Sequence, residues 1–382
     1  MSRTTGTYFV MTLERAKAPA ESPSPAMAAA AAYTVAEADL DRDREAILAV
    51  WRRNLPDKEL AAAKFDWYYR SNPLGSGRIW KLIADSTGEI VGTAGMGRRR
   101  LKVGPESLIV GLNSDFAVDE SHRSLLPAIR LQKAAVTMMP EYAALLYGLP
   151  NVNAIAVLNR VGYKDSGKII RHAKILRSGS YLRRIPALKP VAPVIGVAVD
   201  LAIRAAAKET WVSFGGRTVK NVNGFDERFD ALWQRVRSRY VIATERTADY
   251  LDWRYNQCPL REFRTVALFD CAEQTLHGYA VTYLDGRHAR IADIVADDEI
   301  DLKRTLAAAV KAVRTQGAES VSLLAGEHPE LAVPLLDFGF RRREDDGSSR
   351  RIITNLGPNS EKLWPQNAER EWFFLAGDED FN

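Results

Sequence analysis

The segment Lys64–Leu74, KFDWYYRSNPL, has a closely similar counterpart in the same chain, YLDWRYNQCPL, at Tyr250–Leu260. Both stretches read Asp-Trp-x-Tyr, and in both a proline follows the tryptophan by six residues. An internal repeat has to be recognised before a fold is assigned, because it changes the number of structural units to expect. The repeated signature therefore predicts that the chain contains the same unit twice.

Three further landmarks keep their spacing in the two halves: a glycine, a lone aspartate in an apolar stretch, and a glycine followed by an aromatic residue. They are Gly92, Asp115 and Gly162 in the first half, and Gly278, Asp293 and Gly339 in the second. The first glycine follows the signature tryptophan by 25 residues in both halves. The last glycine follows the aspartate by 47 and 46 residues. This agreement extends the predicted duplication over most of the chain.

Hydrophobic periodicity predicts the same order of elements in each half: helix, β-hairpin, strand, helix, strand, helix, strand. The predicted hairpins cover residues 79–95 and 263–281, and the long helices cover 125–139 and 301–317. Strands at 143–149 and 320–326 come next, followed by short helices at 153–162 and 329–339. The expected fold class is therefore α/β with mixed sheets, arranged as two tandem domains that a helical linker joins.

The domain boundaries are predicted from composition. We expect a disordered tail (1–32), a first domain (33–178), a helical linker (179–215), a second domain (216–356) and an acidic, aromatic tail (357–382). Arg183 and Arg184 precede an apolar run, Ile185–Val199, in the linker. This run indicates either an interdomain helix that buries its apolar face against both halves, or a helix in the inner-membrane interface. The final tail either folds back onto a domain or swings as a regulatory tail.

The composition is that of a soluble globular protein, with 46% hydrophobic and 26% charged residues. The net charge of +5 favours anionic partners in general without selecting one. The two cysteines, Cys258 and Cys271, form neither a disulfide scaffold nor a metal-ligand spacing, so we expect no metal and a reducing, cytoplasmic compartment. The first 32 residues contain neither a compact apolar signal segment nor a continuous apolar span, so a secretory signal is not expected.

Two motifs in the first half resemble those of the GNAT acetyltransferase superfamily. Val118, Arg123 and Ala128 match the segment V-x-x-x-x-R-x-x-G-x-G/A, although Leu126 stands where this pattern has a glycine. Asn151, Ala154 and the pair Gly162-Tyr163 match the later segment N-x-x-A…G-F/Y. With its predicted tandem halves and its Asp-Trp-x-Tyr and Asn-Pro elements, this chain resembles the acyltransferases of bacterial exopolysaccharide and holdfast biosynthesis. The resemblance covers roughly residues 34–355 and implies transfer of an acetyl group from acetyl-CoA to an amino sugar.

The resemblance also implies a coenzyme site, in which backbone N–H groups at the start of a helix hold the coenzyme A pyrophosphate. The matching positions in this chain are Phe116, Val118, Arg123, Ser124, Leu125, Leu126, Ala128 and Asn151. Leu126 places a side chain where glycine would allow close approach, and the Ser124 hydroxyl or the Arg123 charge can compensate. The second half has no such arginine-glycine loop, so coenzyme binding is expected in the first half.

Acyl transfer to an amine needs a proton acceptor for the ammonium group and a proton donor for the leaving thiolate. Asp115 is the expected base, with Asp119 and Glu120 as alternatives, and Asp115 could equally be a structural carboxylate. Leu158 occupies the position where the family often has its tyrosine acid. Tyr163 is therefore the candidate acid, with Tyr147 as an alternative, and either tyrosine could be a packing residue. The signature tryptophans could line an acceptor groove, but core packing is the favoured interpretation.

A dense arginine cluster follows Gly339-Phe340. Arg341, Arg342 and Arg343 precede Asp345, and Arg350 and Arg351 come soon after. A solvated β-hairpin with cross-strand ion pairs explains this pattern. The alternative is a regulatory site, at Arg341–Arg343 and Asp345, for a guanine dinucleotide such as cyclic di-GMP, because guanidinium groups bind phosphates and bases with paired hydrogen bonds.

Three functions are compatible with these features. The first is an N-acyltransferase, cytoplasmic or peripheral at the inner membrane, that acts on an amino sugar of a surface polysaccharide or its precursor. The second is a non-catalytic protein of the same fold that binds a nucleotide or a glycan. The third is an aminoacyl-tRNA-dependent transferase, which usually carries a long charged helical arm that this sequence lacks, so no nucleic-acid partner is expected.

Overall fold

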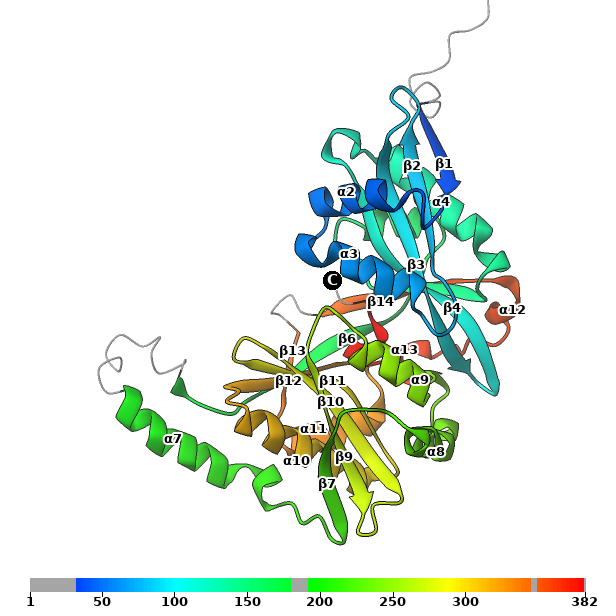
Figure 1. Cartoon of the computed structure of the whole chain (residues 1–382). Helices are drawn as coiled ribbons and strands as arrows, with labels where there is room; N and C mark the ends of the chain where they lie inside the picture. Colours follow the sequence, from blue (N-terminus) through cyan, green and yellow to red (C-terminus); the bar gives the residue numbers. More distant parts are fainter. Residues whose placement is uncertain (1–31, 180–191, 345–348, 381–382) are drawn as a thin grey trace, which may run out of the picture.

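The computed structural model describes residues 32–179, 192–344 and 349–380. The predicted disordered tail falls outside these residues, apart from Ala32, and Asp345 of the predicted nucleotide site also lies outside them. The elements below are therefore those of the described part of the chain (Figure 1).

The first half contains the predicted elements, preceded by an additional edge strand. They are β1 (Tyr33–Glu37), α2 (Arg44–Asn54), α3 (Ala61–Phe65), β2 (Arg78–Ala84), β3 (Ile90–Val103), β4 (Glu106–Val118), α4 (Leu125–Met138), β5 (Leu145–Gly148), α5 (Ile155–Arg160) and β6 (Lys164–Ile175). Strands β3 and β4 form a long hairpin that pairs as far as Val103 and Glu106. The predicted hairpin and helices of this half are confirmed.

The second half follows α7 (Ala192–Ala206) and has a similar order of elements, with an additional short strand between its first two helices. It contains β7 (Arg217–Val222), α8 (Glu227–Val236), β8 (Ile242–Thr244), α9 (Ala248–Leu251), β9 (Phe263–Asp270), β10 (Leu276–Asp285), β11 (His288–Ala296), α10 (Glu299–Thr315), β12 (Ser320–Ala325) and α11 (Pro329–Asp337). The chain ends with β13 (Arg341–Arg343), β14 (Arg350–Leu356), α12 (Pro358–Glu361), α13 (Ala368–Glu371) and β15 (Trp372–Phe373). The second predicted hairpin and long helix are therefore also confirmed.

The described strands form one continuous mixed sheet whose main path has the order β1-β2-β3-β4-β5-β14-β6-β12-β11-β10-β9-β7, and β8, β13 and β15 pair beside this path. The two halves exchange strands at its centre: β14, near the end of the chain, pairs with β5 of the first half. Reciprocally, β6 of the first half pairs with β12 of the second. Figure 1 shows β14 and β6 where the upper and lower parts of the molecule meet. This exchange, which the sequence did not indicate, joins the halves through backbone hydrogen bonds.

The arginine cluster does not form the predicted β-hairpin. Strands β13 and β14 both pair antiparallel with β6, with Arg343 opposite Arg171 and Arg350 opposite Ile169. Strands β13 and β14 therefore pair with successive parts of β6 and not with each other across a turn. The expectation of cross-strand ion pairs within a hairpin is wrong, because β6 already supplies the hydrogen-bonding edge for both segments.

The two copies of the aromatic signature each form a π-helical turn, η2 (Asp66–Arg70) and η8 (Asp252–Asn256). Trp67 and Trp253 in these turns are both buried. Arg254 lies over the Trp67 ring at 5.6 Å, and Arg99 lies over the Trp253 ring at 5.0 Å. The favoured interpretation of the tryptophans as packing residues agrees with this burial.

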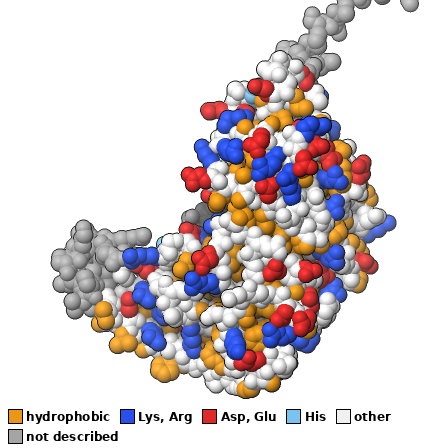
Figure 2. All heavy atoms as spheres, viewed as in Figure 1, with side chains coloured by type: hydrophobic (Ala, Val, Ile, Leu, Met, Phe, Trp, Pro, Cys, Tyr) orange, Lys and Arg blue, Asp and Glu red, His pale blue; other side chains and the backbone are white. Residues whose placement is uncertain are grey.

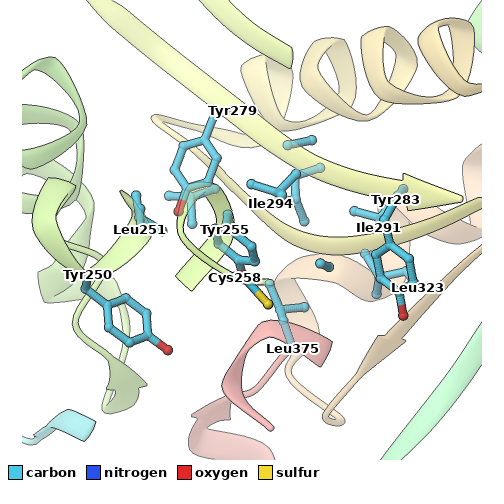
Figure 3. Close-up of a cluster of buried hydrophobic side chains, with 14 of the residues drawn as sticks. Tyr250, Leu251, Tyr255, Cys258, Tyr279, Tyr283, Ile291, Ile294, Leu323 and Leu375 are labelled. Atoms are coloured by element: carbon cyan, nitrogen blue, oxygen red, sulfur yellow. The ribbon is translucent and has the colours of Figure 1, made fainter. Parts of the chain in front are cut away.

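The final tail folds back into the protein. Strand β15 pairs in parallel with β8, and Trp372 to Asp380 are buried. Leu375 belongs to the same buried cluster as Cys258 and Tyr255, and Figure 3 shows its side chain among those of the second half. Of the two alternatives for this tail, the structure therefore has the one that folds back.

Helix α7 does not bury its apolar residues as the interdomain interpretation requires. Val197 is 71% exposed and Leu201 is 67% exposed, and Figure 1 shows the helix extending away from the sheet. Apolar side chains gather at the lower left of Figure 2, where α7 lies. Asp200 anchors the helix by accepting hydrogen bonds from the backbone N–H and the hydroxyl of Ser178. No helix in the described residues is both long and apolar enough to span a membrane.

Candidate functional site

A β-bulge in β4 positions the candidate base. The pairing of β3 with β4 shifts between Thr93–Ala117 and Gly95–Ser114, so Asp115 and Phe116 both stand opposite Ala94. Asp115 has a φ of 51°, in the left-handed region that residues with a side chain rarely adopt. Bulges of this kind commonly redirect a side chain next to a functional site. The bulge turns the Asp115 carboxylate toward α3 and the η2 turn.

Asp115 is held in a buried ion pair. Its carboxylate accepts from Lys64 Nζ at 2.7 Å and from the Tyr69 hydroxyl at 2.6 Å, and the residue is 2% exposed. Burial alone would lower the pKa of Lys64, but the charges of Asp115 and Asp380 outweigh it and raise that pKa. Burial and the Asp115 charge raise the pKa of Tyr69 well above its ordinary value. Both carboxylate oxygens of Asp115 therefore already accept a strong hydrogen bond.

Gly95 makes this arrangement possible. A Cβ atom at position 95 would lie 1.9 Å from the Tyr69 hydroxyl oxygen, which is a severe steric clash. Glycine at this position leaves room for Tyr69 to reach across β3 to Asp115. The contact between the signature and the lone aspartate thus depends on a third residue that the repeat analysis did not single out.

A cavity of about 230 Å³ opens where β4 and β5 separate. These parallel strands pair at Gly111–Leu146 and Leu112–Tyr147, before the cavity begins. Its walls come from the end of β4, the segment after β5, helix α5, the segment after α2 and the C-terminal segment. The lining residues are Leu55, Pro56, Asn113, Ser114, Asp115, Phe116, Gly148, Leu149, Pro150, Asn151, Ala154, Leu158 and Asp380. The predicted residues Asp115, Phe116 and Asn151 are thus brought together here.

The start of α4 lies beyond Val118 at the end of β4. Leu126 is 41% exposed, so its side chain points to solvent and does not fill the space at the helix start. Leu125 is exposed as well, whereas Pro127 and Ala128 are buried against the core. Pro127 has no N–H group, so the first turn offers one backbone donor fewer than a helix start without proline.

Arg123 and Asn151 have local structural partners. Arg123 Nε donates to the Val118 carbonyl at 3.2 Å, and its Nη2 donates to Asn54 Oδ1 at 2.9 Å. The Asn151 side chain accepts from the backbone N–H groups of Asn153 and Ala154, both at 3.0 Å. Ser124 is the N-cap residue of α4 and has an extended backbone. These contacts fix the loop before α4 and the loop before α5.

Of the alternative bases, Asp119 is paired and Glu120 is exposed. Asp119 accepts from Arg53 Nη2 at 2.6 Å and from Asn54 Nδ2 at 2.6 Å. Burial would raise the pKa of Asp119, but its bonds with Arg53 and Asn54 lower it overall. A carboxylate with a lowered pKa is a poor proton acceptor.

The two candidate acids are both buried. The Tyr163 hydroxyl accepts from Asn113 Nδ2 at 3.3 Å, and burial raises the pKa of Tyr163. Asn113 lines the cavity, so Tyr163 stands behind the cavity wall. The Tyr147 hydroxyl donates to the Asp378 carbonyl at 2.8 Å. Both side chains therefore make the packing contacts that the sequence left as their alternative role.

Asp380 is the site residue that sequence reasoning missed. It lines the cavity, and its Oδ2 lies 3.9 Å from Lys64 Nζ, on the same lysine that pairs with Asp115. Burial raises the pKa of Asp380, and the Asp115 charge adds to this effect. The sequence holds one signal, the acidic run Asp378-Glu379-Asp380, but nothing in that run indicates a position beside β4.

The equivalent aspartate of the second half lies in a different environment. Asp293 accepts from Arg246 Nε at 3.0 Å and from the Tyr279 hydroxyl at 3.1 Å. Arg246 also pairs with Asp378 at 3.0 Å, and all three charged groups are about 2% exposed or less. Burial raises the pKa of Asp293. This arrangement is that of a buried structural ion-pair network.

The arginines of the predicted nucleotide site are exposed on β13. Arg342 donates to Glu327 Oε1 at 2.8 Å and also forms an ion pair with Glu344. In the described residues, no group of three or more histidine, cysteine, aspartate or glutamate side chains could hold a metal ion.

No family model and no curated protein matches the sequence. Solved structures are similar in fold at 11% identity. A probable N-acyltransferase from Enterococcus faecalis V583 has a TM-score of 0.59, with 85% of this chain and 72% of that chain covered. A GCN5-related N-acetyltransferase from Anabaena variabilis has a TM-score of 0.60 with the same coverage. The N-myristoyltransferase of Saccharomyces cerevisiae, solved with bound myristoyl-CoA, has a TM-score of 0.52, with 90% and 88% covered. The chain therefore has a mixed α/β fold of the GNAT type.

Proposed function

We propose that the protein is an acyl-CoA-dependent N-acyltransferase whose reaction takes place in the cavity between β4 and β5. The observation that carries this proposal is the position of that cavity: it opens at the β4 bulge, and the same strand leads into the start of α4. A thioester held along this opening would present its carbonyl beside buried carboxylates. Acetyl-CoA is the proposed donor, in agreement with the resemblance of the Val118–Ala128 and Asn151–Tyr163 motifs.

The coenzyme pyrophosphate is proposed to bind at the first turn of α4. Helix starts attract anions because their N–H groups lack intrahelical partners and carry the positive end of the helix dipole. The exposed positions of Leu125 and Leu126 leave this turn open to solvent. Because Pro127 has no N–H group to donate, the proposed anion site at the start of α4 binds more weakly than a helix start with a full set of N–H groups.

The second half lacks the conditions for the same role. Asp298 caps α10 by accepting from the Asp301 N–H at 2.8 Å, so a carboxylate already occupies the helix start. Glu299 and Asp301 add negative charge in the first turn. A pyrophosphate at this position would have to displace the Asp298 carboxylate from the helix start. We infer that a GNAT-type module was duplicated and that only its first copy binds the coenzyme.

The proposal is tested by calorimetry of the full chain with acetyl-CoA. We expect saturable binding of one coenzyme per chain, and the variant Leu126→Gly should preserve or tighten it because the backbone becomes more accessible. Asp298→Asn, at the start of α10, is the matched control and should leave the affinity within about twofold. Absence of binding by the native chain and by Leu126→Gly would overturn the proposal and favour the non-catalytic nucleotide- or glycan-binding alternative.

An amino sugar of a surface polysaccharide or its precursor is the proposed acceptor. Support comes from the resemblance of the duplicated Asp-Trp-x-Tyr element and of Asn72-Pro73, which occurs in the first copy, to exopolysaccharide and holdfast acyltransferases. The acceptor is tested by release of the coenzyme A thiol in the presence of glucosamine and its oligomers. The aminoacyl-tRNA-dependent alternative predicts instead that transfer requires a charged tRNA.

Two further features are proposed to connect this activity to its surroundings. The exposed arginines Arg341–Arg343 are proposed to bind cyclic di-GMP, in competition with Glu327 and Glu344 for Arg342. The exposed apolar residues of α7, together with Trp211, are proposed to rest on the inner-membrane surface.

A further inference from the structure

The last described residues, Leu375–Asp380, form a segment that we call the C-terminal strap. Its acidic side chains each pair with a basic residue from a different part of the chain. Asp378 pairs with Arg246 at 3.0 Å, Glu379 pairs with Arg350, and Asp380 lies 3.9 Å from Lys64 Nζ. The strap therefore has a fixed path from the core of the second half to the cavity of the first half.

The backbone of the strap is fixed as well. Arg254, which is fully buried, donates from Nε to the Gly377 carbonyl at 2.8 Å and from Nη2 to the Glu379 carbonyl. The Tyr147 hydroxyl donates to the Asp378 carbonyl at 2.8 Å. These bonds hold the residues on the N-terminal side of Asp380 within the protein interior. Asp380 is thereby placed at the cavity wall by contacts that do not involve its own side chain.

Two carboxylates line the cavity, and they differ in their distance from Lys64 Nζ. Asp115 accepts short hydrogen bonds from Lys64 and Tyr69 on its two oxygens, at 2.7 and 2.6 Å. Asp380 stands farther from the same lysine, at 3.9 Å. A proton that reached Asp115 would weaken its ion pair with buried Lys64, which is costly in a low-dielectric interior. Asp380 can take up a proton while Lys64 stays paired with Asp115.

We propose that Asp380 is the proton acceptor of the reaction, and that Asp115 positions it through Lys64. This inference rests on the proposed acyl transfer. The ammonium group of the acceptor gives a proton to the Asp380 carboxylate, and the amine nitrogen then attacks the thioester carbonyl carbon. The C–N bond forms as the C–S bond breaks, and the thiolate leaves. One proton passes from the new amide nitrogen to the thiolate through solvent, and Asp380 releases its own to water.

The charges around Asp380 fit this role. Burial raises its pKa and the Asp115 charge raises it further, whereas Lys64, Arg350 and Arg99 lower it. The balance leaves the pKa of Asp380 above its ordinary value. A carboxylate of reduced acidity is a better general base than an ordinary aspartate, because proton transfer is most effective when its pKa approaches the working pH.

The test compares Asp380→Asn with Glu379→Gln in the full chain. Glu379 is the matched control, because it is a buried acid of the same strap whose partner is Arg350 and it does not line the cavity. Acetyl-CoA binding is measured by calorimetry, and acetyl transfer by thiol release with glucosamine oligomers over a range of pH. Thermal unfolding of each variant checks that the strap stays in place.

We expect Asp380→Asn to bind acetyl-CoA within about twofold of the native chain and to lose about 100-fold or more in kcat near neutral pH. Its rate should approach the native rate above the pKa of the acceptor amine, because the amine is then already deprotonated. Glu379→Gln should keep kcat within about twofold.

Three results would overturn the assignment while leaving acyl transfer intact. The first is a native kcat in Asp380→Asn, and the second is a loss of kcat in Glu379→Gln as large as that in Asp380→Asn. The third is a loss of kcat that high pH reverses in Asp115→Asn but not in Asp380→Asn. Failure of the native chain to bind acetyl-CoA, or to acetylate any glucosamine acceptor, would instead overturn the proposed function and this assignment together.

Discussion

Trp67 and Trp253 stack on each other with ring centroids 4.9 Å apart, and each indole Nε1–H donates to the backbone carbonyl of the other residue. The two donor–acceptor distances are 2.9 and 3.2 Å. The two copies of the signature therefore bind one another, because each contributes one tryptophan to the same reciprocal pair. This reciprocity explains why the tryptophan is present in both halves although only the first half has the motif that resembles a coenzyme-binding segment.

Replacement of Trp67 by phenylalanine should destabilise the protein by about 1–3 kcal/mol, because it leaves the buried Trp253 carbonyl without its donor. Trp67→Ala should cost about 3–5 kcal/mol, because it also leaves a cavity. Urea unfolding followed by circular dichroism measures both values. Trp211→Phe is the control, since Trp211 is 73% exposed, and it should change stability by no more than about 0.5 kcal/mol. Equal effects of Trp67→Phe and Trp211→Phe would refute the stacking argument.

Folding stability should depend on pH through Glu379. Burial raises the pKa of Glu379 to about 7, the Asp380 charge adds to this, and Arg350 and Arg254 oppose it. The folded protein thus binds this proton more tightly than the unfolded chain. The stabilising contribution is complete below the glutamate's ordinary pKa of 4.5 and is lost as the pH rises through about 7.

The expected decline in unfolding free energy over this window is at most about 1.4 kcal/mol per pH unit from Glu379. Chemical denaturation at several pH values measures it, and Glu379→Gln should flatten the decline. The control is Glu361→Gln, at an exposed position, which should leave the slope unchanged. A native slope in Glu379→Gln would contradict the assignment of this titration.

Cyclic di-GMP binding, if Arg341–Arg343 form its site, should depend on Arg342 and on its carboxylate competitors. Arg342→Ala should weaken binding by about tenfold or more, the effect of one lost charge-assisted hydrogen bond. Glu327→Gln should tighten binding, because Arg342 then has one ion-pair partner fewer. Calorimetry measures both, with Arg351→Ala, whose guanidinium pairs with Asp165, as the control. Unchanged affinity in Arg342→Ala would exclude this site.

Membrane association should depend on the exposed apolar residues of α7. The native chain should sediment with vesicles that contain anionic phospholipid, and Val197→Glu with Leu201→Glu should reduce the bound fraction by about tenfold, because buried apolar area and surface charge drive such binding. Val333→Glu provides the comparison, since Val333 is an exposed apolar residue on α11. A native chain that stays in the supernatant would rule out the membrane proposal.

Local pattern and spacing in the sequence were sufficient for much of the fold. The offsets from Trp67 to Gly92 and from Trp253 to Gly278 predicted matching hairpins, and the structure has them in β2–β3 and β9–β10. Helix α10 was predicted because its apolar residues recur with the helical period, a signal that one segment carries by itself. The motif around Val118 likewise directed attention to the end of β4, where the cavity lies.

Contacts between distant segments could not be predicted in this way. The exchange of β6 and β14 depends on which strand edges meet, and the apolar pattern of a strand does not indicate which strand will pair with it. The arginines of β13 and β14 were assigned to a hairpin for this reason, although both segments pair with β6. The apolar run of α7 indicated a helix correctly but did not reveal that Val197 and Leu201 would stay exposed.

Pattern and spacing along the chain were enough to predict a mixed α/β fold, and they also predict a duplication and a coenzyme site in the first copy. Only the tertiary structure decided the environment of Asp115 and the position of Asp380 beside it. Asp115 and Lys64 are 51 residues apart in the chain, and Asp380 joins them from near its end. The physical reason is that burial and ion pairing depend on distances in space, whereas periodicity and spacing report only distances along the chain.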